Sequence, residues 1–253
     1  MKTRFLSLAL IFAVMMSGLV GCGSDEPPEP APKQITIAGE TYSTDLTELD
    51  LIFENLYDSD IEPLKYMTNL NKLDLSINSI NDLSALSKLN NLTELSLNGN
   101  QVSNIIVLSG LSNLTKLQLG GNQISDISPL SGLTNITNLG LWGNPISDIS
   151  ALSGLTNLTW LALTDNKISD ISALSGLTNL TNLNLGGNQI SDTSALSGLT
   201  NLTQLSLWGN QISDISALSG LTNLIWLNLT NNHLSEAQIE EFRAALPDCE
   251  ILF

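Results

Sequence analysis

The sequence predicts an α/β solenoid: a right-handed coil of repeated turns, with a parallel sheet on its concave face and short 3-10 or helical turns on its convex side. Three observations support this fold class. From Met67 the chain repeats every 22 residues, as in LTNLTQLSLWGNQISDISALSG over residues 199–220. Each copy contains two leucines separated by one residue, the alternation of a strand with one buried face. Aromatic residues make up only 5% of the chain, which favours a repeat architecture built on small aliphatic side chains.

Residues 1–21 are expected to be a signal peptide. Lys2 and Arg4 precede an apolar run over residues 5–20, which is short for a membrane span and suits a secretory signal. The run ends in Leu-Val-Gly-Cys, which resembles the lipobox of bacterial lipoproteins. This resemblance implies cleavage before Cys22 and acylation of its sulfur, and two acyl chains suffice for stable anchoring. Ordinary secretory cleavage nearby, with Cys22 incidental, is the alternative.

Residues 22–34 are expected to be the lipidated cysteine and a proline-rich spacer. The segment has four prolines, three acids and no large apolar residue, so we expect an extended, disordered chain. After cleavage the chain has 25 acidic and 7 basic residues, a net charge of −18. Nucleic acid is therefore not expected as a partner, and membrane contact is expected through the lipid anchor only.

Residues 35–66 are expected to form an N-terminal cap and a degenerate first repeat. A strand is expected first, and Leu46, Leu49 and Leu51 then occupy the leucine positions of a repeat. Residues 52–60 depart from the repeat consensus and are acidic. Such a cap is needed because an open solenoid end exposes its core.

Residues 67–232 are assigned to eight 22-residue repeats whose strands stack into one sheet. One asparagine recurs where the chain leaves each strand, and its amide is expected to bridge backbone groups of adjacent turns. An aspartate recurs before the Ile-Ser-Ala-Leu-Ser-Gly segment and is expected to cap a short helical turn, with a calcium ladder as the alternative. The aspartates are Asp82, Asp126, Asp148, Asp170, Asp192 and Asp214, and Asn104 takes the remaining place.

Residues 233–253 are expected to form the C-terminal cap, a helix followed by a final strand. Ser235 and Gln238 match a capping box at the start of the helix. Leu246, Cys249 and Ile251 have the spacing of the strand leucines, so Cys249 is expected to be a buried hydrophobic residue and not a nucleophile.

The repeat consensus L-x-x-L-x-x-L-x-L-x-x-N-x-I-x-x-I-x-x-L resembles the leucine-rich repeat, and ISDISALSGLTNL is most similar to the internalin-type bacterial class. This resemblance implies a binding protein whose partners are proteins, such as receptors on host or neighbouring cells. No catalytic residue, metal site or cofactor is expected. The single histidine and the one cysteine of the expected folded domain offer no metal-ligand spacing, so an enzyme is not expected.

The four tryptophans are expected to project from the concave face, because they stand at positions that alternate with the buried leucines. Exposed tryptophan flanked by uncharged polar residues suggests a recognition surface. The candidate ligand-binding residues are Trp142, Trp160, Trp208, Trp226, Asn138, Asn182, Asn184, Gln204 and Asn228. Residues 119–166 and 185–232 match each other, so duplication of a three-repeat block and neutral inheritance is the alternative explanation.

The function expected from the sequence is that of a lipid-anchored surface protein in the bacterial cell envelope. The protein is expected to lie outside the cytoplasm and to recognise a protein partner through the concave face. A glycan-binding surface module and a structural envelope protein without a specific ligand are the alternatives.

Overall fold

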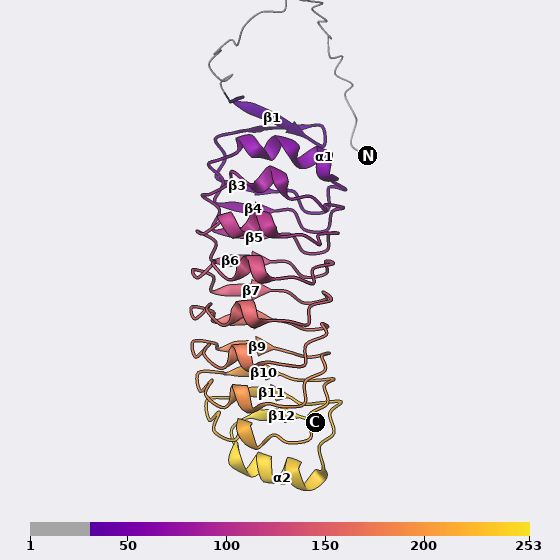
Figure 1. The fold of residues 1–253 in the computed structure, drawn as a ribbon, viewed down its shortest axis with the longest axis vertical. Coiled ribbons are helices and arrows are strands. Elements are labelled where there is room, and N and C mark those ends of the chain that lie inside the picture. Colours follow the sequence, from indigo (N-terminus) through magenta and orange to yellow (C-terminus); the bar gives the residue numbers. More distant parts are fainter. Residues whose placement is uncertain (1–30) are drawn as a thin grey trace, which may run out of the picture. The chain divides into compact units, whose positions relative to one another are not determined.

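The computed structural model describes residues 31–253, and residues 32–253 form one compact unit. The expected signal peptide, Cys22 and most of the expected spacer lie outside the described residues. Within residues 32–253 the strands stack one after another, with β1 at one end of the stack and α2 at the other (Figure 1). No helix in this described part is both long and apolar enough to cross a bilayer.

Ten parallel strands form one sheet in the order of the sequence. Consecutive strands pair in register, so that Leu183, Leu205 and Leu227 lie side by side. Because each repeat contributes one short strand at the same position, the expected parallel sheet is confirmed. The strands are β3 (Glu48–Asp50), β4 (Lys72–Asp74), β5 (Glu94–Ser96), β6 (Lys116–Gln118), β7 (Asn138–Gly140), β8 (Trp160–Ala162), β9 (Asn182–Asn184), β10 (Gln204–Ser206), β11 (Trp226–Asn228) and β12 (Glu250–Leu252).

Within the repeats, seven 3-10 turns lie on the side of the unit opposite the sheet. Each follows an aspartate, or Asn104, whose side-chain oxygen accepts the backbone N–H two residues later, as Asp170 Oδ1 does from Ser172 N at 2.8 Å. The expected capping role of this column is therefore confirmed. The turns are η2 (Ser84–Leu86), η3 (Ile106–Gly110), η4 (Ser128–Leu130), η5 (Ser150–Leu152), η6 (Ser172–Leu174), η7 (Ser194–Leu196) and η8 (Ser216–Leu218).

Leucine and isoleucine side chains fill the space between sheet and turns. One asparagine in each repeat binds the backbone where the chain leaves the strand; it is half-buried at Asn78 and Asn232 and buried at Asn100, Asn122, Asn144, Asn166, Asn188 and Asn210. Asn188 is typical: its Nδ2 donates to the carbonyls of Leu163 and Leu185 at 2.9 and 3.0 Å, and its Oδ1 accepts from Ile168 N at 3.0 Å. Each such amide therefore satisfies buried backbone groups of two adjacent repeats, as expected.

The N-terminal cap is a hairpin of β1 (Gln34–Ile37) and β2 (Glu40–Ser43), followed by α1 (Asp58–Ile61) and η1 (Glu62–Tyr66). The expectation that Leu46 occupies a buried leucine position is wrong, because this side chain is 37% exposed. Leu46 precedes β3, the terminal strand of the sheet, so no preceding repeat covers it. Ile35 and Ile37 of β1 are buried instead, and β1 packs against η1.

The C-terminal cap is α2 (Glu236–Ala245) followed by β12. Ser235 and Gln238 form the expected capping box, with the Ser235 amide donating to Gln238 Oε1 at 3.0 Å. Cys249 is only half-buried and packs against the core. Burial, and then the nearby Glu250 carboxylate, raise the pKa of the Cys249 thiol, which keeps it neutral as a packing residue rather than a reactive thiolate.

Candidate functional site

The face of the sheet that points away from the core, here called the open face, presents its side chains in rows. The middle residue of each strand from β3 to β11 is a buried leucine, so the first and third residues project outward. A further outward position follows two residues after each strand. Because the strands are in register, residues at equivalent positions form rows that run across the repeats.

All four tryptophans lie on the open face and outside the hydrophobic core, as the sequence predicts. Trp160 and Trp226 are the first residues of β8 and β11, and both are half-buried. Trp142 and Trp208 stand two residues after β7 and β10; Trp142 is 41% exposed and Trp208 is half-buried. Three of the four rings are thus less exposed than the sequence suggests.

The indole rings of Trp142 and Trp208 lie on glycine pairs of the preceding repeat. A β-carbon placed on Gly186 would overlap the Trp208 ring, and one on Gly187 would lie 3.3 Å from Trp208 Cη2. Trp142 covers the equivalent pair, Gly120 and Gly121. The second glycine of each pair also adopts a positive φ, 64° at Gly121 and 65° at Gly187. The first glycine of each pair, Gly120 or Gly186, leaves the space that the indole ring occupies, and the sequence alone did not reveal this role.

A shallow hollow of about 120 Å³, here called the aromatic hollow, lies on the open face between Trp160 and Trp226. Its floor is formed by β9 and β10, and it includes Asn182, Asn184 and Gln204. Asn182 Nδ2 donates to Gln204 Oε1 at 2.8 Å, so the two amides are fixed relative to each other. Five of the nine candidate residues therefore meet in one uncharged depression with an aromatic ring at each end.

The other four candidate residues lie elsewhere on the open face. Trp142 and Trp208 cover their glycine pairs. Asn138 accepts a hydrogen bond from Gln118 Nε2, and Asn228 Oδ1 accepts from Thr230 N at 3.0 Å and from Thr230 Oγ1 at 2.8 Å. The structure does not bring these four into the aromatic hollow.

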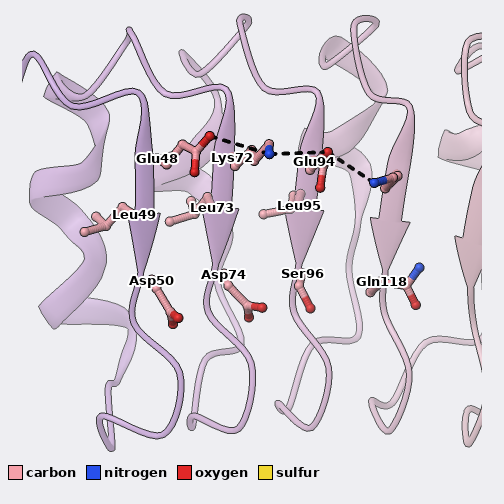
Figure 2. Close-up of a pocket in the computed structure, with 11 residues that line it drawn as sticks. Glu48, Leu49, Asp50, Lys72, Leu73, Asp74, Glu94, Leu95, Ser96 and Gln118 are labelled. Atoms are coloured by element: carbon pink, nitrogen blue, oxygen red, sulfur yellow. Dashed lines mark hydrogen bonds and ion pairs between the residues drawn. The ribbon is translucent and has the colours of Figure 1, made fainter.

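A larger hollow of about 500 Å³, here called the charged hollow, occupies the open face over β3 to β6, and sequence reasoning missed it. Figure 2 shows a chain of ion pairs across its upper row. Lys72 Nζ lies 3.5 Å from Glu48 and 3.8 Å from Glu94, and Lys116 Nζ lies 3.3 Å from Glu94. Charge of alternating sign at the first strand position of four successive repeats was the signal that could have identified this hollow.

A second row in the charged hollow contains Asp50 and Asp74, the last residues of β3 and β4 (Figure 2). One oxygen of each carboxylate accepts a backbone N–H: Asp50 from Ile52 at 3.0 Å and Asp74 from Ser76 at 2.9 Å. Among the described residues, no lysine or arginine lies within 4.0 Å of either carboxylate. Both aspartates therefore face the hollow without a cation.

The aspartate column on the far side of the unit serves the backbone. Hydrogen bonds from the serine two residues later, the backbone N–H first and then the hydroxyl, lower the pKa values of Asp126, Asp148, Asp170, Asp192 and Asp214. In the part of the chain that the structure describes, no three His, Cys, Asp or Glu side chains are grouped so that they could hold a metal ion.

Comparison with known proteins gives consistent matches over the repeats. The family model described as leucine-rich repeats (2 copies) matches residues 112–154, 156–198 and 200–244, and a second leucine-rich repeat model matches residues 44–102. No curated protein matches the chain.

Solved structures match as well. An internalin (InlF) of Listeria monocytogenes is 38% identical over 83% of this chain, with a TM-score of 0.78; the chain covers 61% of that protein. Internalin C2 of the same organism is 37% identical over 76% of this chain and 86% of its own, with a TM-score of 0.72. A leucine-rich repeat protein of Leptospira interrogans is 26% identical over 76% of this chain and 57% of its own, with a TM-score of 0.66.

Proposed function

The chain belongs to the leucine-rich repeat family and is internalin-like, and from this premise we propose that it binds a protein partner through the open face of its sheet. Leucine-rich repeat folds of this kind suggest protein–protein binding. The aromatic hollow is the observation that carries the proposal for this chain. It combines two tryptophan rings with fixed amides in one hollow on the open face.

The chemistry of the aromatic hollow suits recognition of an uncharged surface. Tryptophan contributes large contact area with little loss of conformational entropy, and it dominates many interface energies. The amides of Asn182 and Gln204 offer both donors and acceptors to a partner backbone. Trp208 stands two residues beyond β10, and its ring packs on Gly186 and Gly187 of the preceding repeat. This ring therefore extends the surface at a fixed orientation.

Glycan binding is the second candidate function, and the same hollow favours it. Aromatic rings and adjacent amides suit the apolar faces and hydroxyl groups of sugars. A purely structural role in the envelope is the remaining alternative. Affinity capture from surface-protein extracts and a glycan array, both run with the full chain, would separate the three: a protein partner supports the proposal, sugar binding replaces it, and no binding in either assay overturns it.

The binding test uses the double variant Trp160→Ala, Trp226→Ala. We expect its affinity for the captured protein to fall by more than tenfold, because interface tryptophans are frequent hot spots. Ile106→Ala is the matched control, because Ile106 is 59% exposed but lies on η3, away from the sheet. Unchanged affinity in the tryptophan variant would exclude the aromatic hollow as the binding site.

We also propose that the protein is secreted and held in the bacterial envelope by a lipid on Cys22. The support comes from the sequence before residue 31, where a charged start, an apolar run and Leu-Val-Gly-Cys follow one another. Cys22→Ser should release the protein from the membrane fraction. A variant that still sediments with membranes after a high-salt wash would contradict lipid anchoring.

A further inference from the structure

We infer that the charged hollow is a second binding subsite, which takes a partner segment that carries a basic residue next to a large apolar side chain. This inference rests on the proposed function, because it uses the same open face. It concerns β3 to β6, three strands or more away from the floor of the aromatic hollow on β9 and β10.

The basic half of the ligand follows from how the charges of the charged hollow are distributed. Four carboxylates and two ammonium groups line it, which leaves a net charge of −2. The ammonium groups of Lys72 and Lys116 are already paired with glutamates, whereas Asp50 and Asp74 have no cation among the described residues. An incoming lysine or arginine would complete this pattern, and an incoming carboxylate would meet unpaired negative charge.

The whole unit favours the same sign of ligand. From residue 31 onward the chain has 22 acidic and 7 basic residues, a net charge of −15. A surface of this charge attracts basic segments over several ångströms and raises their rate of encounter. The attraction of basic segments should be strongest at the charged hollow, because its carboxylates line a concavity.

The apolar half of the ligand follows from three exposed side chains beside Asp50 and Asp74, here called the apolar ledge. Phe53 is 68% exposed, Ile77 is 54% exposed and Ile52 is 40% exposed. The ledge follows the carboxylates in the chain: Asp50 Oδ1 accepts from the Ile52 amide at 3.0 Å, and Phe53 and Ile77 stand three residues after Asp50 and Asp74. A basic residue at the aspartates would therefore place a neighbouring side chain on the ledge.

The chain also offers variants that test the ledge without harming the fold. Phe53 and Ile77 have positive φ values of 59° and 57°, where Gly99 and Gly121 stand in later repeats. Glycine adopts this conformation without strain, so Phe53→Gly, Ile77→Gly removes both side chains and suits the backbone. Likewise Asp50→Asn, Asp74→Asn removes two charges while the amide oxygen can still accept the backbone N–H.

The test measures binding of three synthetic decapeptides to the full chain by fluorescence anisotropy. One contains Arg-Leu pairs, the second has Glu in place of Arg, and the third has Ser in place of Leu. We expect the Arg-Leu peptide to bind at least tenfold more tightly than either of the others. Its affinity should fall about tenfold in Asp50→Asn, Asp74→Asn, together with most of its salt dependence, and severalfold in Phe53→Gly, Ile77→Gly.

Asp148→Asn, Asp170→Asn is the matched control, because it removes the same charge from the opposite side of the unit and should leave the affinity unchanged. Loss of affinity in this control would reduce the effect to net charge and overturn the inference. If the Arg-Ser peptide binds as tightly as the Arg-Leu peptide, the apolar ledge is not part of the subsite. If the Arg-Leu peptide does not bind, the inference is refuted. The variant Trp160→Ala, Trp226→Ala should bind the Arg-Leu peptide normally, so failure of the aromatic hollow and failure of this subsite are distinguishable.

Discussion

Gly186→Ala is expected to destabilise the protein, although glycine-to-alanine changes usually stabilise a chain when the backbone conformation allows alanine. Gly186 has no positive φ, so its backbone accepts a β-carbon. That carbon would lie 2.5 Å from Trp208 Cε2 and closer still to two other ring atoms. The Trp208 ring must therefore leave its position on Gly186 and Gly187.

The size of the effect follows from the surface that the ring loses. A fully buried aromatic side chain covers about 150–250 Å², so half-buried Trp208 covers about 100 Å². At about 25 cal/mol per Å², its complete displacement costs about 2.5 kcal/mol. The lower entropy of the unfolded alanine chain returns about 0.4–1 kcal/mol. We expect a net loss of about 1.5–2 kcal/mol in the free energy of unfolding.

Urea unfolding followed by circular dichroism measures this loss, and Gly198→Ala is the matched control. Gly198 also has a negative φ, and a β-carbon there would meet no atom within 4 Å. Acrylamide should quench tryptophan fluorescence more readily in Gly186→Ala, because the displaced ring faces water. In a Trp208→Ala background, Gly186→Ala should no longer destabilise. Equal midpoints for Gly186→Ala and Gly198→Ala, or the same loss in both backgrounds, would refute the packing of ring on glycine.

Three further changes test other parts of the structure. Asn188→Leu should cost about 3 kcal/mol or more in chemical unfolding, because Ile168 N–H and two buried carbonyls lose their partner; a loss below 1 kcal/mol would contradict the bridging role. Asp170→Ala should melt lower than Asp170→Asn, which keeps an acceptor for Ser172 N, and added calcium should shift neither melting temperature. Hydrogen bonds from Ser172 lower the pKa of Asp170 in the folded state, so the stability that this carboxylate contributes should be complete above pH about 4 and should be lost as the pH falls through the folded-state pKa. The melting temperature of the wild type should therefore exceed that of Asp170→Ala above pH about 4, and this difference should disappear in acid. A difference that grows in acid would contradict the capping role. Ile77→Gly should raise the free energy of unfolding by about 1 kcal/mol, because it relieves an isoleucine with positive φ, and a decrease would contradict that strain.

The sequence predicted the repeated part of the fold well, because the same pattern of residues recurs in every repeat. Alternating leucines specify a strand with one buried face, and a recurring asparagine specifies an amide that binds backbone at each turn. The ends were harder to predict, because they occur once. Leu46 has the spacing of a buried leucine, but burial depends on a neighbouring repeat that β3 lacks on its outer side.

The candidate site could be predicted only in part. Alternation along each strand placed Trp160 and Trp226 on the open face, but it could not show that they close the two ends of one hollow. Nor could it show that Gly186 makes room for Trp208, because that contact joins residues 22 positions apart. The charged hollow was overlooked because its charges are ordinary surface residues within each repeat. Only their register across β3 to β6 makes them a site.

The packing of Trp208 on glycines of the preceding repeat restricts how such a chain can gain or lose repeats during evolution. Loss of residues 177–198 alone would bring the repeat containing Thr164 and Asp165 under the ring, where side chains fill the space. Loss of two repeats would bring Trp142 there. Loss of residues 133–198 would bring Gly120 and Gly121, and so restore a surface that accepts the ring. A block of 66 residues, three repeats, is thus the smallest that can be removed before Trp208 while a glycine pair still lies under its ring.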